Sequence, residues 1–193
     1  MIPVRPEEIA NRIRVELDAS GALLFEVKGS KLRDRGSGVA SHVEGIGQPM
    51  RWLSLSAVDP ARQEVFDWLR GQVAAQGGTM TIGKGLLSGG LCSAFRAMSR
   101  RLFPRHRSPP SFYALRHAAC AELKACGIEA SEVAKGMGHA SALSQKTYGM
   151  KSQGSGQYVI KADASSFIRI APFSPLPTSA KHHVGIKNGC FRN

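Results

Sequence analysis

The sequence predicts an α+β fold that is mostly α, with three short antiparallel strands followed by a series of helices. Strand-like runs separated by turn residues occupy the first part of the chain, whereas later segments repeat apolar side chains at helical spacing. The 193 residues suit one domain with enough apolar side chains to bury a core.

The first expected elements are a short helix and the three strands. The helix covers 6–12 and has an acidic first turn, which suits the positive end of the helix dipole. Strands at 14–17 and 23–27 are joined by turn residues, and the third strand is expected at 51–55. Residues 32–49 are rich in glycine and have no periodicity, which predicts a long loop.

Helices are expected through most of the rest of the chain. Asp59-Pro60 predicts a helix start, because it combines an N-cap with Pro at the first helical position, and Gly77-Gly78 predicts its end. The apolar stripe of this helix is Val65, Trp68, Leu69 and Val73. The further helices are expected at 90–102, 111–126, 131–137 and 144–148. In the first of these, the apolar side carries Phe95, Met98 and Leu102. Residues 151–193 predict a basic, partly flexible tail with one ordered segment at 166–170.

The charge balance points to an acidic polymer as partner. The chain has 26 Lys and Arg against 14 Asp and Glu, a net charge of +12. Because these charges are spread over loops and helices, nucleic acid is favoured over a membrane surface. No apolar run is long enough to predict a membrane span, and no apolar leader follows the first Met. The four cysteines form no C-x-x-C pair, which favours reduced thiols and a cytoplasmic, nucleoid-associated protein.

Three motifs place an Arg, a His and a Tyr on consecutive segments of the second half. They are Tyr113-Ala-Leu-Arg116-His117, Gly136-Met-Gly-His139 and Thr147-Tyr148-Gly149. A guanidinium is planar, permanently charged and bidentate toward phosphate oxygens. A tyrosine can form a covalent intermediate with an electrophile. In a basic chain, this combination predicts chemistry on a nucleic-acid phosphodiester.

These motifs resemble the catalytic domain of the tyrosine recombinases, also called the phage integrases. That family carries H-x-L-R-H, then L-G-H, then a nucleophilic Tyr nine residues after the last His, and the same spacing separates His139 from Tyr148. Tyr113 replaces the first His of the pattern, and Met137 replaces the Leu. A phenol can donate one hydrogen bond to phosphate, but it cannot act as a neutral base as His can.

The resemblance extends toward the N-terminus in the family's order. Residues 4–8 resemble the first box, G-x-R-P-x-E, which supplies a second Arg at Arg5. Residues 23–31 resemble a strand ending in G-K-G-x-K, and residues 48–55 resemble the returning strand, x-R-x-x-x-L. The resemblance implies a catalytic domain over 2–150, built as a helical bundle with a small antiparallel three-stranded sheet on one edge. It also implies that the family's N-terminal DNA-clamping domain is absent before Arg5.

The resemblance implies a role for each motif residue. Arg5 and Arg116 would bind the scissile phosphate, and Tyr113 and His139 would donate hydrogen bonds to it. Tyr148 would attack phosphorus and form a covalent 3′-phosphotyrosine, while cations fixed beside the phosphate stabilise the charge of the transition state.

The leaving 5′ oxygen needs a proton, and Lys28 is the first candidate for this acid. Lys31 is the alternative. No cofactor, metal or nucleotide is implied, and Gly78–Gly85 fits G-x-x-x-x-G-K without the following Ser or Thr that binds Mg²⁺. The basic residues expected to contact DNA are Lys31, Lys84, Arg100, Arg101, Arg105 and Arg107.

The expected partner is double-stranded DNA, with the chain a monomer in free solution and a tetramer when assembled on DNA. In this family the C-terminal tail docks on a neighbouring subunit. Each site residue, taken singly, has an ordinary structural explanation such as packing or solvation, and His117 reads as a structural hydrogen-bonding group. Two other functions stay open: a non-catalytic DNA-binding remnant of a truncated integrase, and strand transfer of the type IB topoisomerase kind.

Overall fold

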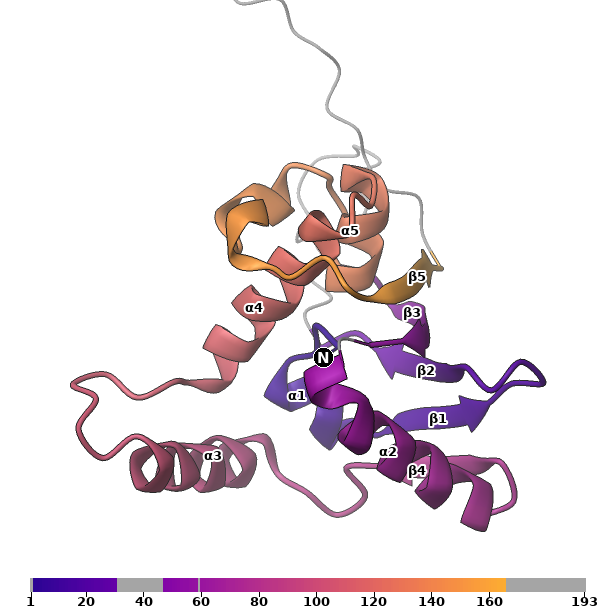
Figure 1. Ribbon diagram of the computed structural model, residues 1–193, viewed down its shortest axis with the longest axis horizontal. Helices are drawn as coiled ribbons and strands as arrows, with labels where there is room; N and C mark the ends of the chain where they lie inside the picture. The colour runs from indigo at the N-terminus through magenta and orange to yellow at the C-terminus, as the bar shows by residue number, and fades with distance from the viewer. Residues whose placement is uncertain (1, 31–46, 59, 166–193) are drawn as a thin grey trace, which may run out of the picture.

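The computed structural model describes residues 2–30, 47–58 and 60–165 (Figure 1). Within these ranges the chain forms five α-helices and one five-stranded antiparallel sheet, in the strand order β4-β1-β2-β3-β5. The α+β class is therefore confirmed, whereas the prediction of a three-stranded sheet is wrong. The strands are β1 Ile13–Leu17, β2 Leu23–Lys28, β3 Met50–Ala57, β4 Thr79–Ile82 and β5 Val159–Ala164.

The helices follow the predicted order with small differences at their ends. The α-helices are α1 Pro6–Ala10, α2 Gln63–Ala75, α3 Ser88–Leu102, α4 Phe112–Ala125 and α5 Ala130–Met137. Three short 3₁₀ turns accompany them: η1 Pro60–Arg62, η2 Ser144–Thr147 and η3 Lys151–Gln153. No helix in the described part of the chain is both long and apolar enough to cross a membrane.

The predicted hairpin is present and has the expected turn. β1 pairs with β2 from Ile13 opposite Val27 to Leu17 opposite Leu23. The Asp18 carboxylate accepts hydrogen bonds from the backbone N–H groups of Ser20 and Ala22, each at 2.8 Å. This side chain thus does what Asp commonly does in turns, which is to bond the backbone two residues on.

The two added strands lie at the edges of the sheet. β4 pairs with β1 and comes from the segment that resembles a phosphate-binding loop. β5 pairs with β3 of its own chain and comes from the segment predicted as a tail. Both are short, and their pairing partners lie far away in sequence, so the local pattern carries little signal. The predicted ordered segment at 166–170 lies outside the described residues.

Two helices expose part of the apolar stripe that the sequence predicts for them. In α2 the side chains of Val65 and Trp68 are exposed, while Phe66 and Val73 are buried against the sheet. In α3, Met98 and Leu102 are exposed. Figure 1 shows α3 away from the sheet, and its contacts are with α1 and α4. A helix that packs mainly against two other helices leaves part of its apolar stripe uncovered.

Candidate active site

The carboxylate of Glu8, in the first turns of α1, holds two arginines. Arg5 Nη1 lies 2.7 Å from Glu8 Oε1, and Arg51 reaches both carboxylate oxygens at 3.0 and 2.7 Å. Arg5 precedes α1, whereas Arg51 comes from β3. Burial would raise the pKa of Glu8, but the hydrogen bond and charge of Arg51, together with the charge of Arg5, hold it below its ordinary value. Glu8 is therefore an anion that fixes two cations.

Arg51 is fully buried and supports the turn before His139. Its Nη2 also donates to the Pro3 carbonyl at 3.2 Å. Gly138 follows α5 with a φ of +68°, a left-handed conformation that favours glycine. A Cβ at this position would lie 2.6 Å from Arg51 Nη1. The Gly before His139 thus serves both the backbone conformation and the close approach of Arg51.

Arg116 joins three segments that are far apart in sequence. It lies on α4, is only 1 % exposed, and donates to the carbonyls of Pro3 and Met137. Its Nη2 lies 3.4 Å from His139 Nε2. Burial lowers the pKa of Arg116 to about 10, with a further contribution from the charge of Arg5. Arg116 therefore remains charged at neutral pH.

His139 is held as a neutral side chain beside Arg116. Burial first, and then the charges of Arg116, Arg5 and Arg51, lower the pKa of His139 to about 3. Its Nδ1 is buried and has no hydrogen-bond partner among the described residues. If Nε2 accepts from Arg116, the single proton of the neutral ring is on Nδ1, and this buried N–H has no acceptor among the described residues.

The Tyr148 ring covers Arg116 and His139. The Arg116 guanidinium carbon lies 5.5 Å from the centroid of the Tyr148 ring, and the His139 and Tyr148 ring centroids are 5.1 Å apart. On the other side, the His117 ring lies 4.8 Å from Tyr148, and His117 Nδ1 accepts a hydrogen bond from Gly149 N at 3.3 Å. These contacts agree with the structural role that the sequence suggests for His117.

Tyr113 lies at the exposed margin of this cluster. It is on α4, three residues before Arg116, and is 41 % exposed. Burial and the charge of Glu7 raise the pKa of Tyr113, while the charge of Arg5 opposes them. Tyr113 therefore stays protonated at neutral pH and can donate a hydrogen bond.

The cluster carries more positive than negative charge. The charged side chains that shift the pKa of His139 are Arg116, Arg5, Arg51 and Glu8, which are three cations and one anion. Buried charges are costly unless they are paired. The excess suits a ligand with negative charge, such as a phosphodiester.

The predicted lysines are not brought into this cluster. Lys28 is exposed at the end of β2, and no hydrogen bond or ion pair connects it to the site residues within the described ranges. Lys31 lies outside the described residues. The other basic residues predicted to contact DNA are all exposed: Lys84, Arg100, Arg101, Arg105 and Arg107.

In the sequence, Arg51 and Glu8 stand within motifs, but no role in the site was predicted for either residue. Both stand in boxes of the family pattern, so the boxes held the signal that could have found them. Lys124, which binds the backbone around Tyr148, belongs to no motif, and no sequence signal indicates it.

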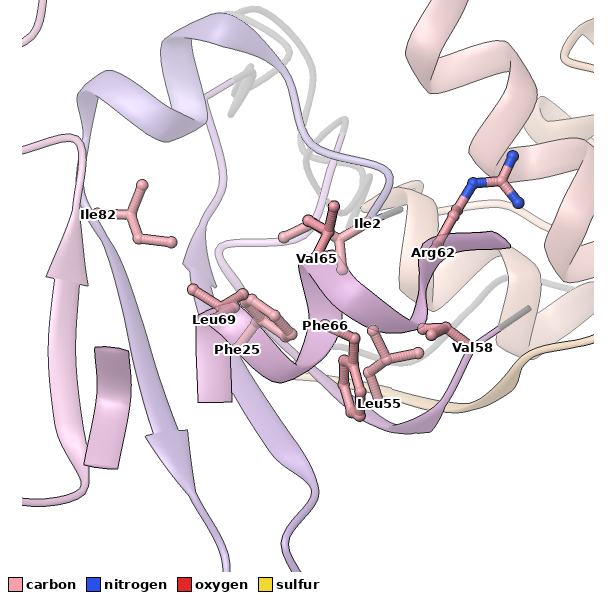
Figure 2. A pocket seen from close by; sticks show the side chains of 9 residues that line it. All are labelled: Ile2, Phe25, Leu55, Val58, Arg62, Val65, Phe66, Leu69 and Ile82. Atoms are coloured by element: carbon pink, nitrogen blue, oxygen red, sulfur yellow. The ribbon is translucent and has the colours of Figure 1, made fainter. Parts of the chain in front are cut away.

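An apolar groove of about 410 Å³ lies elsewhere, between α2 and the sheet. Figure 2 shows its lining, in which α2 side chains such as Phe66 and Leu69 stand beside Phe25 and Leu55 from the strands. None of the clustered Arg, His and Tyr side chains contributes to this groove, so the charged cluster is the candidate site. Comparisons with family models, with curated proteins and with solved structures give no match for this chain.

Proposed function

We propose that this chain cleaves and rejoins double-stranded DNA through a covalent 3′-phosphotyrosine, as the catalytic domain of a tyrosine recombinase in site-specific recombination. One observation carries the proposal: the guanidinium of Arg116 and the rings of His139 and Tyr148, from three separate segments, lie within about 5.5 Å of one another. Arg5 is tied to this group through Glu8, whose carboxylate also binds Arg51, and after burial its charge helps to lower the pKa of both Arg116 and His139. A nucleophile beside cations that carry a net positive charge suits an anionic electrophile.

The proposed step exchanges one phosphodiester for another. The Tyr148 oxygen attacks phosphorus, the bond from phosphorus to the 5′ oxygen breaks, the phenol loses its proton and the 5′ oxygen gains one. Religation runs the same exchange backwards, so no external energy source is needed. Arg5, Arg116 and the N–H of His139 would stabilise the negative charge that the non-bridging oxygens gain in the transition state.

Entry of the phosphate requires a movement of Tyr148. Arg116 is 1 % exposed, and the Tyr148 ring is among the groups packed against its guanidinium. The contact of a guanidinium with a ring is weaker than the charge-assisted, bidentate hydrogen bonds that Arg makes with phosphate. DNA binding would therefore turn the ring away from the guanidinium and bring its hydroxyl toward the phosphorus. Tyr113, at the exposed margin, would donate to the same phosphate.

Protonation of the 5′ oxygen is assigned to Lys28, with Lys31 as the alternative. Lys28 ends β2 and pairs with Met50, the residue of β3 that precedes Arg51. An exposed lysine is free to approach DNA that lies over the cluster. This assignment rests on the motif resemblance.

Trapping on a nicked suicide duplex tests the proposal. In such a substrate the short leaving fragment diffuses away, so the covalent adduct accumulates. We expect wild-type protein to form a denaturation-resistant adduct, and Tyr148→Phe to form none while binding DNA as the wild type does. Tyr158→Phe is the matched control, since Tyr158 is a buried tyrosine beside Arg62, and it should keep the adduct. An adduct with Tyr148→Phe would mean that another residue is the nucleophile.

The burial of Arg116 favours a second candidate, a non-catalytic DNA-binding domain. In that case the ring would stay over the guanidinium and the cluster would serve only to stabilise the fold. Wild-type protein that binds the nicked duplex but forms no adduct at any protein concentration would select this candidate.

A further inference from the structure

Lys124 binds the backbone on both sides of Tyr148. It lies on α4, eight residues after Arg116, which corresponds to about two helical turns. Its Nζ donates to the carbonyls of Gln145, Tyr148 and Gly149 at 3.0, 2.7 and 2.7 Å. A lysine ammonium has three N–H donors, so these three acceptors use all of them. The contact is half-buried, which shields it from competing water.

The carbonyls that Lys124 binds belong to η2 and to the two residues after it. The Gln145 carbonyl also accepts the N–H of Tyr148 at 3.1 Å, whereas the carbonyls of Tyr148 and Gly149 accept no other hydrogen bond among the described residues. A cation at such an end is favourable, because the carbonyl dipoles point toward it. Lys124 thus supplies from α4 the hydrogen bonds to the Tyr148 and Gly149 carbonyls that the short turn leaves unmade.

Two further contacts hold the same segment against α4. His117 Nδ1 accepts the N–H of Gly149 at 3.3 Å. Gly149 also lies so close to the helix that a Cβ there would be 2.2 Å from the His117 carbonyl oxygen. The segment is therefore fixed to the helix that carries Arg116 by a cation, an imidazole and a close backbone approach.

We propose that Lys124 is a positioning residue for Tyr148. It fixes the backbone beside the nucleophile to α4, so that the phenol and the Arg116 of one chain act on the same phosphate. This inference rests on the proposed function. In it, Lys124 holds the Tyr148 backbone in the position that the attack on phosphorus requires. Lys124 does not touch DNA or the reacting atoms, and it acts only through the carbonyls on either side of the Tyr148 side chain.

Three full-length variants test this role. Lys124→Met removes the donors and keeps most of the side-chain volume, while Lys124→Arg keeps a charged donor. Lys135→Met is the matched control, since Lys135 is a half-buried lysine on α5 whose Nζ makes only a 3.5 Å ion pair with exposed Asp163 among the described residues. The first readout, limited trypsin digestion without DNA, reports opening of the segment, because exposed Lys146 and Lys151 stand on either side of Tyr148.

In the digestion we expect Lys124→Met to be cut about tenfold or more faster at Lys146 and Lys151, because cutting follows the local opening equilibrium. Cutting at Arg100 and Arg101 in α3 should not change. Lys124→Arg should fall close to wild type, and Lys135→Met should equal it. Unchanged cutting in Lys124→Met overturns the proposal. Equal acceleration at all sites would show general destabilisation and also overturns it.

The second readout is the single-turnover rate of adduct formation, together with the dissociation constant for DNA. Displacement of a catalytic group by about 1 Å can cost on the order of 10²-fold in rate. We expect Lys124→Met to lose rate on that scale with unchanged DNA affinity, and Lys124→Arg to recover most of it. Local opening without a loss of rate overturns the positioning role. If wild type forms no adduct, the proposed function fails and the role in attack fails with it, while the digestion still decides whether Lys124 holds the segment.

Discussion

At the residue scale, the site is organised around buried charge. Arg51, Arg116 and Glu8 are each at most 1 % exposed, yet all three carry charge at neutral pH. A single carboxylate compensates Arg5 and Arg51, whereas Arg116 relies on backbone carbonyls. Removal of one partner from such a group leaves a buried charge without compensation, which is strongly destabilising. Substitutions here should therefore be read through both activity and stability.

The position of Arg116 beside Tyr148 and His139 predicts a large loss of rate when its guanidinium is removed. Arg116→Ala should reduce the single-turnover rate of adduct formation by on the order of 10³ or more, because an Arg that stabilises phosphate charge in a transition state is worth that much. Arg116→Lys should recover little, since an ammonium lacks the bidentate fork. A near-normal rate in the Lys variant would show that charge alone is sufficient. Rates should be compared at saturating DNA, so that binding does not enter.

The neutral His139 predicts a loss of stability in mild acid. Its pKa is lowered from 6.5 to about 3 in the folded chain, so the unfolded state binds a proton first as the pH falls. The contribution of His139 to the free energy of unfolding is fully present above about pH 6.5. It declines by about 1.4 kcal/mol per pH unit down to about pH 3. Chemical denaturation at pH 7, 6 and 5 should show this slope in wild type and a flatter one in His139→Gln. Equal slopes would mean that His139 is not held neutral.

At the element scale, the hairpin and the order of the helices could be predicted, but the sheet edges could not. Turn residues such as Asp18 act locally, so their signal lies in a few neighbouring positions. β4 and β5 depend on partners in β1 and β3 that lie far away in the chain. The exposure of Met98 and Trp68 likewise depends on where a helix lies, which no local pattern reports.

The candidate site was predictable to a similar extent. The motifs named Arg5, Tyr113, Arg116, His139 and Tyr148, and the structure brings these side chains into one cluster. Of the residues that support them, Arg51 and Glu8 stand within the motif boxes although no role was predicted for them, whereas Lys124 belongs to no motif, because a lysine that binds backbone carbonyls follows no sequence spacing. The residue after α5 shows this dependence most clearly, because a Cβ at Gly138 would lie 2.6 Å from the Arg51 side chain of β3.

Two glycines at helix ends allow the cost of a left-handed backbone conformation to be distinguished from the cost of steric crowding. Gly127 after α4 and Gly138 after α5 have φ values of +74° and +68°. No atom lies within 4 Å of a Cβ built at Gly127, whereas a Cβ at Gly138 would be 2.6 Å from Arg51. Gly127→Ala should cost about 1–2 kcal/mol of unfolding free energy from the left-handed conformation alone. Gly138→Ala should cost clearly more, and it should also lower the cleavage rate.

Urea denaturation of the two glycine variants measures this difference. The comparison is direct, because both positions follow a helix and have nearly the same φ. Equal losses of unfolding free energy would mean that Arg51 does not constrain the turn before His139.

At the scale of the whole molecule, we expect the excess of positive charge to govern the proposed binding of DNA. The net charge of +12 is distributed over several elements, and the basic residues at the end of α3 and after it are exposed. Contacts with phosphates position a protein without reading bases. Non-specific affinities of about 10⁻⁴ to 10⁻⁶ M near physiological salt are typical of such binding. We expect values in this range for random duplexes, with slight sequence preference.

The salt dependence tests which residues make these contacts. Each neutralised phosphate contributes about −0.9 to the slope of log affinity against log salt. The double variant Arg100→Ala/Arg101→Ala should therefore reduce the slope by about 1.8. Arg14→Ala is the control, because exposed Arg14 is paired with Glu16 on β1 and should change the slope little. An unchanged slope in the double variant would mean that Arg100 and Arg101 of α3 do not contact DNA phosphates.

The most direct test of the central claim is to map the DNA adduct on the protein. Wild-type protein trapped on the nicked duplex would be digested with trypsin and nuclease, and the modified peptide identified by mass spectrometry. Cleavage after Lys146 and Lys151 isolates the five residues 147–151, in which Tyr148 is the single tyrosine. We predict a nucleotide remnant on Tyr148, linked through its 3′ phosphate. A remnant on another residue, or a linkage through a 5′ phosphate, would contradict the proposed mechanism.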